Sequence, residues 1–316
     1  MSAQAVHTEG TMDVVGLSKS FTLRAAGLLG GGTPFRAVDD VSFTLRPGTV
    51  TALVGESGSG KSTVARMLAR LHEPTSGAVL FEGTNVVEHT RRRDVRRYRS
   101  RVQMIFQDPF DSLNPVRTIG HHLERPLRIH DVVPREDVEA RIHDLLRTVG
   151  LVPADRYAAK YPHELSGGQR QRVAIARALA VEPSVILADE PISMLDVSIR
   201  IGILNLILEL KERRRIGFLY ITHDIASARY VADELLVMYA GQVVEQGPTD
   251  AVLVEPLHPY TKLLLSAVPH PDAAQRGAPV ASRDARYRGP FGPGTHLVEV
   301  RPGHLVRVHD EAGTAS

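Results

Sequence analysis

One short run of this sequence combines three glycines, a lysine and several hydroxyl side chains. Its residues are Gly55, Glu56, Ser57, Gly58, Ser59, Gly60, Lys61, Ser62 and Thr63. The spacing G-x-x-x-x-G-K-S is typical of a phosphate-binding loop, in which glycines let successive backbone N–H groups turn toward a polyphosphate. In such a loop Lys61 reaches the β- and γ-phosphates, and Ser62 is a ligand of Mg²⁺. The run therefore predicts a nucleotide site.

The segments on either side of this loop have the patterns of a strand and a helix. Val50–Val54 is an apolar run that predicts a buried strand, and Thr63–Arg70 predicts a helix. The N-terminus of that helix would add partial positive charge at the phosphate site. A Gly/Ser-rich turn before a helix is the alternative interpretation, and the strand–loop–helix order favours phosphate binding over it.

A second chemical run, Val185–Glu190, consists of four apolar residues followed by two acids. The apolar part predicts a central strand buried on both faces, whose end would bring Asp189 next to the phosphate loop. A carboxylate there can hold Mg²⁺ directly or through water, and Glu190 can polarise the water that attacks the γ-phosphate. The alternative is a strand with a solvated acidic turn, which the pairing with a phosphate loop disfavours.

A third run predicts another helix N-terminus that can bind an anion. Leu165–Arg172 reads LSGGQRQR and is followed by strong helix formers. Ser166 fits the N-cap position, and Gly167 and Gly168 would expose backbone N–H groups at the start of the helix.

Composition narrows the classes of protein and of site. The chain has 316 residues, an apolar share of 43%, a formal net charge of +2 and no cysteine. The missing cysteines exclude disulfides and thiolate metal sites, so we expect no iron–sulfur cluster. The near-neutral charge gives no argument for a nucleic-acid partner. No apolar run approaches the roughly 18–20 residues that span a bilayer, and residues 1–10 lack a signal-peptide pattern.

Alternating β-rich and helical patterns predict an α/β fold. We expect a flexible N-terminus over residues 1–11, a nucleotide-binding domain over 12–250 with a helical subdomain at about 108–180, and a C-terminal extension over 251–316. A Gly-rich loop is expected at residues 24–35, between strands at Val14–Thr22 and Val41–Leu45. Within the extension we expect a helix broken near Pro256, a linker at about 269–295 and a hairpin at 296–309.

Together these runs resemble the nucleotide-binding subunit of an ATP-binding cassette (ABC) transporter. Gly55–Ser62 matches its Walker A loop, Leu165–Gln169 its LSGGQ signature, and Val185–Glu190 its Walker B strand. The resemblance covers about residues 12–268. It implies a P-loop fold with a mixed sheet core, an antiparallel β subdomain and a helical signature subdomain, with ATP and Mg²⁺ as cofactors.

Shorter matches follow in the order of that family. Met104–Asp108 resembles the Q-loop, with Gln107 as the sensor of the γ-phosphate and Mg²⁺. Ser193–Asp196 resembles the D-loop that ends in Asp196, although Met194 departs from the usual S-A-L-D, and we expect Met194 to alter packing across a dimer.

The remaining matches concern the two ends of the nucleotide. Tyr220–Asp224 resembles the switch loop, in which His223 would contact the γ-phosphate. Phe21 stands where the family places a ring that stacks on adenine, with an ordinary core position as the alternative. The resemblance assigns catalysis to Lys61, Gln107, Glu190 and His223. It assigns Mg²⁺ binding to Ser62, Gln107 and Asp189.

The resemblance also implies an assembly. Two such subunits would pack head to tail, each offering Ser166, Gly167, Gly168 and Gln169 to the ATP of the other. The implied partners are two transmembrane permease subunits, a second ABC ATPase in a homo- or heterodimer, and indirectly an extracytoplasmic solute-binding protein. The implied location is the cytoplasmic face of the cell membrane, as a peripheral protein.

Four further segments indicate a subfamily. Pro256–Leu264 contains the HPYT element of ATPases that serve oligopeptide, dipeptide and nickel importers, and Asp196–Ile199 and Asp111–Pro115 favour the second of that group's two ATPases. Arg301–Val306 resembles the end of the group's C-terminal extension. Peptide is the leading substrate, with oligosaccharides or nickel as alternatives.

Other classes are disfavoured. Soluble ABC ATPases of the ribosome or of DNA repair have two cassettes or a coiled-coil insertion. Exporter halves fuse the cassette to transmembrane helices or lack the HPYT extension, and an inactive regulatory partner would not keep the intact catalytic set. The basic run Arg91–Arg101 is interpreted as a solvated face, and His121, His122 and the histidines of the tail lack zinc-ligand spacing. His258 is interpreted as a packing and turn residue.

Overall fold

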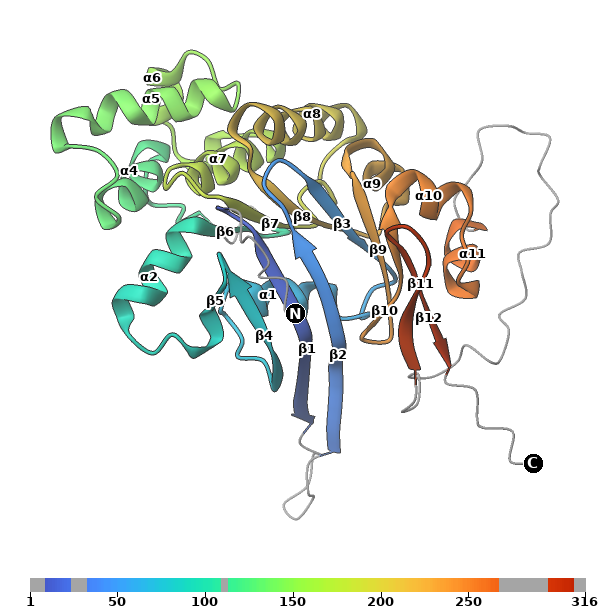
Figure 1. Ribbon diagram of the computed structural model, residues 1–316. Coiled ribbons are helices and arrows are strands. Elements are labelled where there is room, and N and C mark those ends of the chain that lie inside the picture. The colour runs from blue at the N-terminus through green and yellow to red at the C-terminus, as the bar shows by residue number, and fades with distance from the viewer. Residues whose placement is uncertain (1–8, 24–32, 109–112, 267–294, 310–316) are drawn as a thin grey trace, which may run out of the picture.

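The computed structural model describes residues 9–23, 33–108, 113–266 and 295–309. The larger of its two sheets carries the mixed core (Figure 1). Its eight strands follow the order β11-β12-β10-β9-β3-β8-β7-β6. In chain order they are β3 (Val50–Val54), β6 (Val102–Ile105), β7 (Val185–Asp189), β8 (Gly217–Thr222), β9 (Glu234–Tyr239), β10 (Gln242–Pro248), β11 (Thr295–Arg301) and β12 (His304–His309).

The centre of this sheet is parallel and its C-terminal side is antiparallel. β3 pairs in parallel with β8 and β9, and β7 with β6 and β8. β3, β7 and β8 are buried along their whole length, which agrees with their continuous apolar sequences. The predicted α/β fold is therefore confirmed.

The smaller sheet is antiparallel, with the order β2-β1-β4-β5. Its strands are β1 (Met12–Leu23), β2 (Thr33–Leu45), β4 (Ser76–Phe81) and β5 (Thr84–Asn85). The loop predicted at residues 24–35 is too long, because β2 already begins at Thr33 and pairs with the end of β1. Pro34 is tolerated in β2 because this strand lies at the edge of its sheet.

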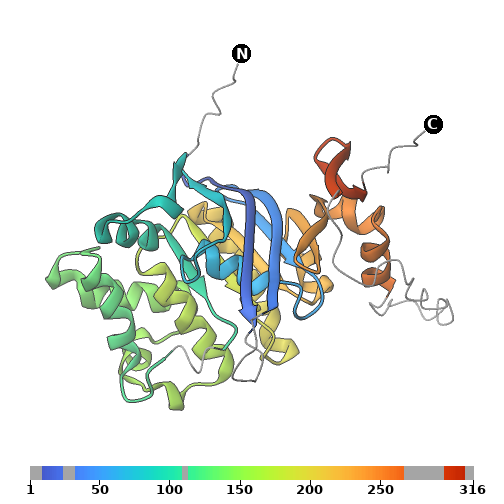
Figure 2. The same cartoon turned by 90° about the horizontal axis from the view of Figure 1, so that it is seen from below.

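Some helices cover the larger sheet directly, and others pack on those helices. They are α1 (Lys61–Leu68), α2 (Arg92–Arg101), α4 (Ile119–Ile129), α5 (Val138–Thr148), α6 (Ala154–Ala159), α7 (Gly167–Leu179), α8 (Val197–Arg214), α9 (Ile225–Val231), α10 (Thr249–Val254) and α11 (Pro259–Ser266), with short 3-10 turns at 86–88, 135–137 and 162–164. Helices α4–α7 lie within the predicted helical subdomain. Figure 2 shows α4–α6 and the C-terminal elements at opposite ends of the molecule.

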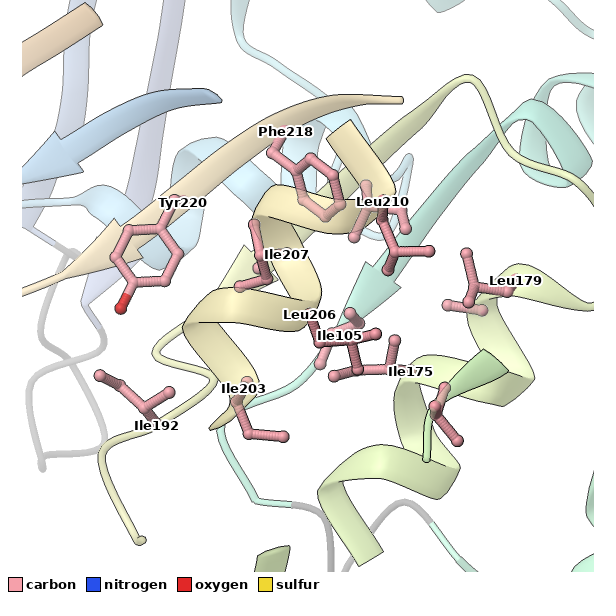
Figure 3. Close-up of a cluster of buried hydrophobic side chains, with 14 of the residues drawn as sticks. Ile105, Ile175, Leu179, Ile192, Ile203, Leu206, Ile207, Leu210, Phe218 and Tyr220 are labelled. Atoms are coloured by element: carbon pink, nitrogen blue, oxygen red, sulfur yellow. The ribbon is translucent and has the colours of Figure 1, made fainter. Parts of the chain in front are cut away.

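Two clusters of buried apolar side chains pack against the two faces of the larger sheet. One joins α1 and the smaller sheet to one face of the larger sheet, and the other joins α7, α8 and α9 to the opposite face. Figure 3 shows this second cluster, in which Ile203, Ile207 and Leu210 of α8 gather near Phe218 and Tyr220 of β8. Each such buried aliphatic or phenylalanine side chain contributes about 1.5–3 kcal/mol, so the packing of α8 on β8 is strongly stabilised.

Within the described parts of the chain, no helix has both the length and the apolar character to cross a membrane. The predicted linker falls almost entirely outside the described residues, as do residues 1–8 of the predicted N-terminal segment and Asp111 and Ser112.

Candidate nucleotide site

The phosphate-loop run connects the end of β3 to the start of α1. Its three glycines have φ values of 152°, 82° and 105° at Gly55, Gly58 and Gly60. A Cβ on Gly55 would lie 2.1 Å from the carbonyl oxygen of Met238, and one on Gly60 would lie 2.3 Å from that of Ala37. Only glycine therefore fits at these two positions, and the loop wraps closely against neighbouring backbone.

Lys61 is buried at the first position of α1. Its Nζ donates hydrogen bonds to the carbonyl oxygens of Gly55 (2.8 Å) and Glu56 (2.7 Å). Burial lowers the pKa of Lys61, while the nearby carboxylates of Glu190 and Asp189 act to raise it. The lysine is thus held by its own loop, at the end of a helix whose partial positive charge attracts phosphate.

Asp189, at the end of β7, reaches the other side of the loop. Its Oδ1 accepts a hydrogen bond from the Ser62 hydroxyl at 2.9 Å. Burial raises the pKa of Asp189, and the Ser62 hydrogen bond and Arg66 act against that rise. A hydroxyl and a carboxylate side by side are hard oxygen donors of the kind that Mg²⁺ prefers, so this pair fits the ion.

Glu190 contacts both side chains that the family resemblance assigns to the γ-phosphate. Its Oε2 accepts from Gln107 Nε2 at 3.1 Å, and its Oε1 lies 3.2 Å from His223 Nδ1. The three residues follow the ends of β6, β7 and β8, which are parallel neighbours. The carboxyl ends of parallel strands meet at one edge of a sheet, and this is why they converge. Glu190 also has a left-handed backbone (φ 47°), a strained state that is common at functional sites.

A cavity of about 660 Å³ connects these groups to the smaller sheet. Its lining residues are Phe21, Phe35, Ala37, Ser57, Gly58, Gly60, Lys61, Ser62, Thr63, Gln107, Glu190 and His223. The predicted ATP-binding, γ-phosphate-sensing and catalytic residues of the phosphate loop and strand ends are therefore brought together, although Gly55, Glu56, Ser59 and Asp189 do not themselves line the cavity.

Two aromatic rings of the smaller sheet line this cavity. Phe21 is partly exposed, with the edge of His72 at 5.8 Å between ring centroids and Lys19 Nζ 5.2 Å from its ring centre. Phe35 is its cross-strand neighbour in β2 and is 48% exposed. Phe35 cannot be found from the sequence, because the Gly-rich pattern places it in a loop and its position beside Phe21 depends on strand register.

The signature run is well formed but does not line this cavity. Ser166 caps α7, since its Oγ accepts from Gln169 N at 3.3 Å while Gln169 Oε1 accepts from Ser166 N at 3.1 Å. Ser166 is exposed, and Gly167 is partly exposed. A Cβ on Gly168 would lie 2.4 Å from the Ile199 side chain, so α7 starts tightly against α8.

The D-loop residue Asp196 also lies away from the cavity. It is the N-cap residue of α8 and is exposed, and Met194 beside it is 56% exposed. Within the described chain Met194 therefore fills no core position. These exposed residues and the signature run lie on the surface and do not line the cavity.

Comparisons with known proteins agree with this geometry. Residues 38–193 match the family described as ABC transporter, and residues 244–289 match the oligopeptide/dipeptide transporter C-terminal region. The chain is 46% identical over 281 residues to the oligopeptide transport ATP-binding protein OppF of Bacillus subtilis (strain 168), covering 86% of this chain and 89% of that protein. It is 47% identical over 250 residues to the di/tripeptide transport ATP-binding protein DppF of Pseudomonas aeruginosa (strain UCBPP-PA14), covering 78% and 76%.

A solved structure shows the same fold. It is the dimeric structure of a post-hydrolysis state of an ATP-binding cassette bound to ADP and Pi, with a TM-score of 0.65 and 29% identity. The similarity covers 75% of this chain and 98% of that one.

Proposed function

This chain belongs to the ABC transporter family, and we propose that it is an ATP-hydrolysing subunit of an importer that brings oligopeptides or dipeptides across the cytoplasmic membrane. The observation that carries the proposal is one cavity lined by Lys61, Ser62, Gln107, Glu190 and His223. The match of residues 244–289 and the printed functions of the two relatives support a peptide substrate. Import of oligosaccharides or nickel by the same machinery is the alternative.

ATP binding follows from the chain's own groups. The backbone N–H groups of the loop and the start of α1 would surround the β- and γ-phosphates, with Lys61 neutralising their charge. Phe21 would stack on adenine at the other end of the cavity. Ser62 and Asp189, with Gln107, would hold Mg²⁺, which when bound neutralises charge on the β- and γ-phosphates.

Hydrolysis depends on Glu190 as the general base for water. In this structure each of its oxygens is engaged, one by Gln107 and one by His223. We expect both side chains to turn to the γ-phosphate when ATP enters, which leaves the Glu190 carboxylate to accept a proton from the attacking water. Lys61 and the turned side chains would then stabilise charge on the transferred phosphoryl group.

The exposed signature run supports action in trans. Ser166–Gln169 starts a capped helix that does not reach the cavity of its own protomer. We propose that it completes the ATP site of a second ABC ATPase, with two permease subunits as the membrane partners and an extracytoplasmic solute-binding protein upstream of them. The chain would act at the cytoplasmic face of the membrane, and ATP-driven closure and opening of the dimer would move the permease.

The ATP site is tested by Lys61→Ala. Loss of a buried cation facing phosphate costs about 3 kcal/mol, so the Kd for ATP should rise about 100-fold or more. Titration with a fluorescent ATP analogue measures this change. Lys262→Ala, which removes an exposed lysine of α11, is the control and should bind like the wild type. Wild-type affinity in Lys61→Ala would contradict the assigned site.

The transport role is tested by co-purification with the permease subunits, followed by a ligand screen on the associated binding protein. We expect stoichiometric recovery of this chain, and a binding protein that takes peptides. Recovery with a binding protein that takes only oligosaccharides or nickel would replace the substrate, and failure to recover any permease would overturn the transport role.

A further inference from the structure

The peptide group between Gly55 and Glu56 is held on both of its sides. Its carbonyl oxygen accepts the hydrogen bond from Lys61 Nζ at 2.8 Å, and its N–H donates to the hydroxyl of Tyr260 at 3.1 Å. Tyr260 lies on α11, 204 residues further along the chain, and is 2% exposed. Because Gly55 lacks a Cβ, its backbone resists rotation of this peptide only weakly, and the two hydrogen bonds supply the restraint.

A tyrosine hydroxyl suits this position. Burial raises the pKa of Tyr260 to about 12, so the hydroxyl is neutral at physiological pH and accepts the Glu56 N–H without adding negative charge beside the phosphate loop. The Tyr239 ring packs against it at 4.3 Å between centroids, which restricts the Tyr260 side chain.

The start of α11 is anchored by a completely buried carboxylate. Glu245 on β10 is 0% exposed. Its Oε1 accepts from Leu257 N and its Oε2 from His258 N, each at 2.9 Å. His258 Nδ1 in turn accepts from Tyr260 N at 3.1 Å, so His258 is a packing and turn residue in this structure. Glu245 thus sets the position from which Tyr260 reaches the loop.

The C-terminal hairpin closes on the same carboxylate. His304, the first residue of β12, is 1% exposed, and its Nε2 donates to Glu245 Oε1 at 2.8 Å. β12 pairs with β10 through residues 305 and 306, and in Figure 1 the hairpin lies beside β10 and α11. An unbroken series of contacts therefore runs from His304 through Glu245, the 257–258 turn and Tyr260 to the peptide that holds Lys61.

We propose that Tyr260 is a positioning residue of the phosphate loop. We further propose that the C-terminal segment, formed by α11 and the β11–β12 hairpin, sets the affinity for ATP through Tyr260. The inference rests on the proposed ATP site. The Tyr260 hydroxyl fixes the orientation of the Gly55–Glu56 peptide, and this peptide presents its carbonyl to Lys61. Without the Tyr260 hydroxyl, the Gly55–Glu56 peptide keeps only its hydrogen bond from Lys61 Nζ. Lys61 and the neighbouring backbone N–H groups are then less well aligned for the phosphates.

Tyr260→Phe removes only the hydroxyl and tests this role. A typical hydrogen bond corresponds to about a threefold to tenfold change, so the Kd and KM for ATP should rise by that factor. Tyr98→Phe is the matched control, because Tyr98 is also buried and also bonds through its hydroxyl to a backbone group, the carbonyl of Leu68, away from the cavity. It should lose stability and keep the ATP affinity of the wild type.

Two results would overturn the role of Tyr260. One is wild-type ATP affinity in folded Tyr260→Phe. The other is an equal loss of affinity in Tyr98→Phe, which would reduce the effect to general destabilisation. Glu245→Gln keeps the shape of the anchor but replaces one acceptor oxygen by an NH2 group, so at least one of the hydrogen bonds from Leu257 N, His258 N and His304 Nε2 is lost. This variant should shift the ATP affinity in the same direction as Tyr260→Phe. An unchanged affinity in Glu245→Gln would remove the C-terminal segment from the proposal.

Amide hydrogen exchange of Glu56 in the nucleotide-free wild type tests the contact without any variant. We expect this amide to exchange slowly. Exchange as fast as that of a solvent-exposed loop amide would contradict the hydrogen bond to Tyr260. This measurement separates two failures. A chain that does not bind ATP contradicts the proposed function, whereas a chain that binds ATP with an unprotected Glu56 amide contradicts only the role of Tyr260.

Discussion

At the scale of single residues, the site contains a buried cation and a buried anion whose pKa values burial shifts in opposite directions. The pKa of Lys61 is lowered and that of Asp189 is raised. Each charged form therefore weakens the folded state. The penalty of charged Lys61 fades as the pH rises through its folded pKa, and the penalty of charged Asp189 fades as the pH falls through its own. Phosphate beside Lys61 and Mg²⁺ beside Asp189 would relieve both, so this desolvation favours ligand binding.

Glu190→Gln should separate ATP binding from turnover. The amide keeps the size of the side chain but cannot accept the proton of water, so kcat should fall at least about 100-fold while the Kd for ATP changes little. Phosphate release and nucleotide titration measure the two quantities. Glu212→Gln, at an exposed position of α8, serves as the control. Rapid hydrolysis by Glu190→Gln would remove Glu190 from the catalytic role.

Phe21→Ala should weaken ATP binding severalfold, because an aromatic stacking contact is worth about 0.5–1.5 kcal/mol. Its partial exposure at the cavity favours this role over a core role. Titration with ATP, together with urea denaturation, distinguishes the two. A core phenylalanine would instead cost about 3–5 kcal/mol of stability and leave the affinity unchanged.

At the scale of elements, the loop between β3 and α1 is shaped by backbone that approaches it from other strands. Gly55→Ala should lower the free energy of unfolding by about 2 kcal/mol or more, because the new Cβ would meet the Met238 carbonyl of β9 at 2.1 Å. Gly58→Ala is the matched control: its φ is also positive, at 82°, but a Cβ there meets no atom of the described chain within 4 Å.

Urea denaturation of the two glycine variants measures the difference. Gly58→Ala should cost only about 1 kcal/mol, the usual penalty of a left-handed non-glycine residue. Equal losses in the two variants would mean that backbone conformation alone, and not the approach of β9, dictates glycine at position 55.

At the scale of the whole molecule, the separation of the signature run from its own cavity predicts a two-protomer ATP site. The chain has no cysteine, so introduced cysteines form the only thiol pair. With Ser57→Cys and Ser166→Cys on separate molecules in the Glu190→Gln background, we expect an ATP-dependent crosslink between protomers. Both positions are exposed. Mixing the chain with its companion ATPase distinguishes a homodimer from a heterodimer.

Absence of any crosslink in both pairings, with ATP saturating, would contradict the shared site.

The C-terminal segment is also a feature of the whole molecule, because its hairpin and α11 are joined to the cassette through the buried Glu245. The extension is thus packed into the nucleotide-binding body along this contact and is more than an attached tail.

The sequence by itself determined the parts of the site that are contiguous in the chain. Glycine spacing predicted a loop with positive φ values, Ser166 predicted a helix cap, and apolar runs ending in acids predicted the buried β7. Each depends on local backbone geometry, which a few neighbouring residues dictate. The resemblance to a family added the roles of Gln107 and His223, but no distance between them.

Only the tertiary structure decided which distant segments meet. Gln107, Glu190 and His223 converge because β6, β7 and β8 are parallel neighbours, and Phe35 lies beside Phe21 because of the register of β1 and β2. Tyr260 reaches the Glu56 amide across 204 residues. Strand order and register depend on how whole layers pack, and that packing leaves no periodic pattern near the residues it brings together.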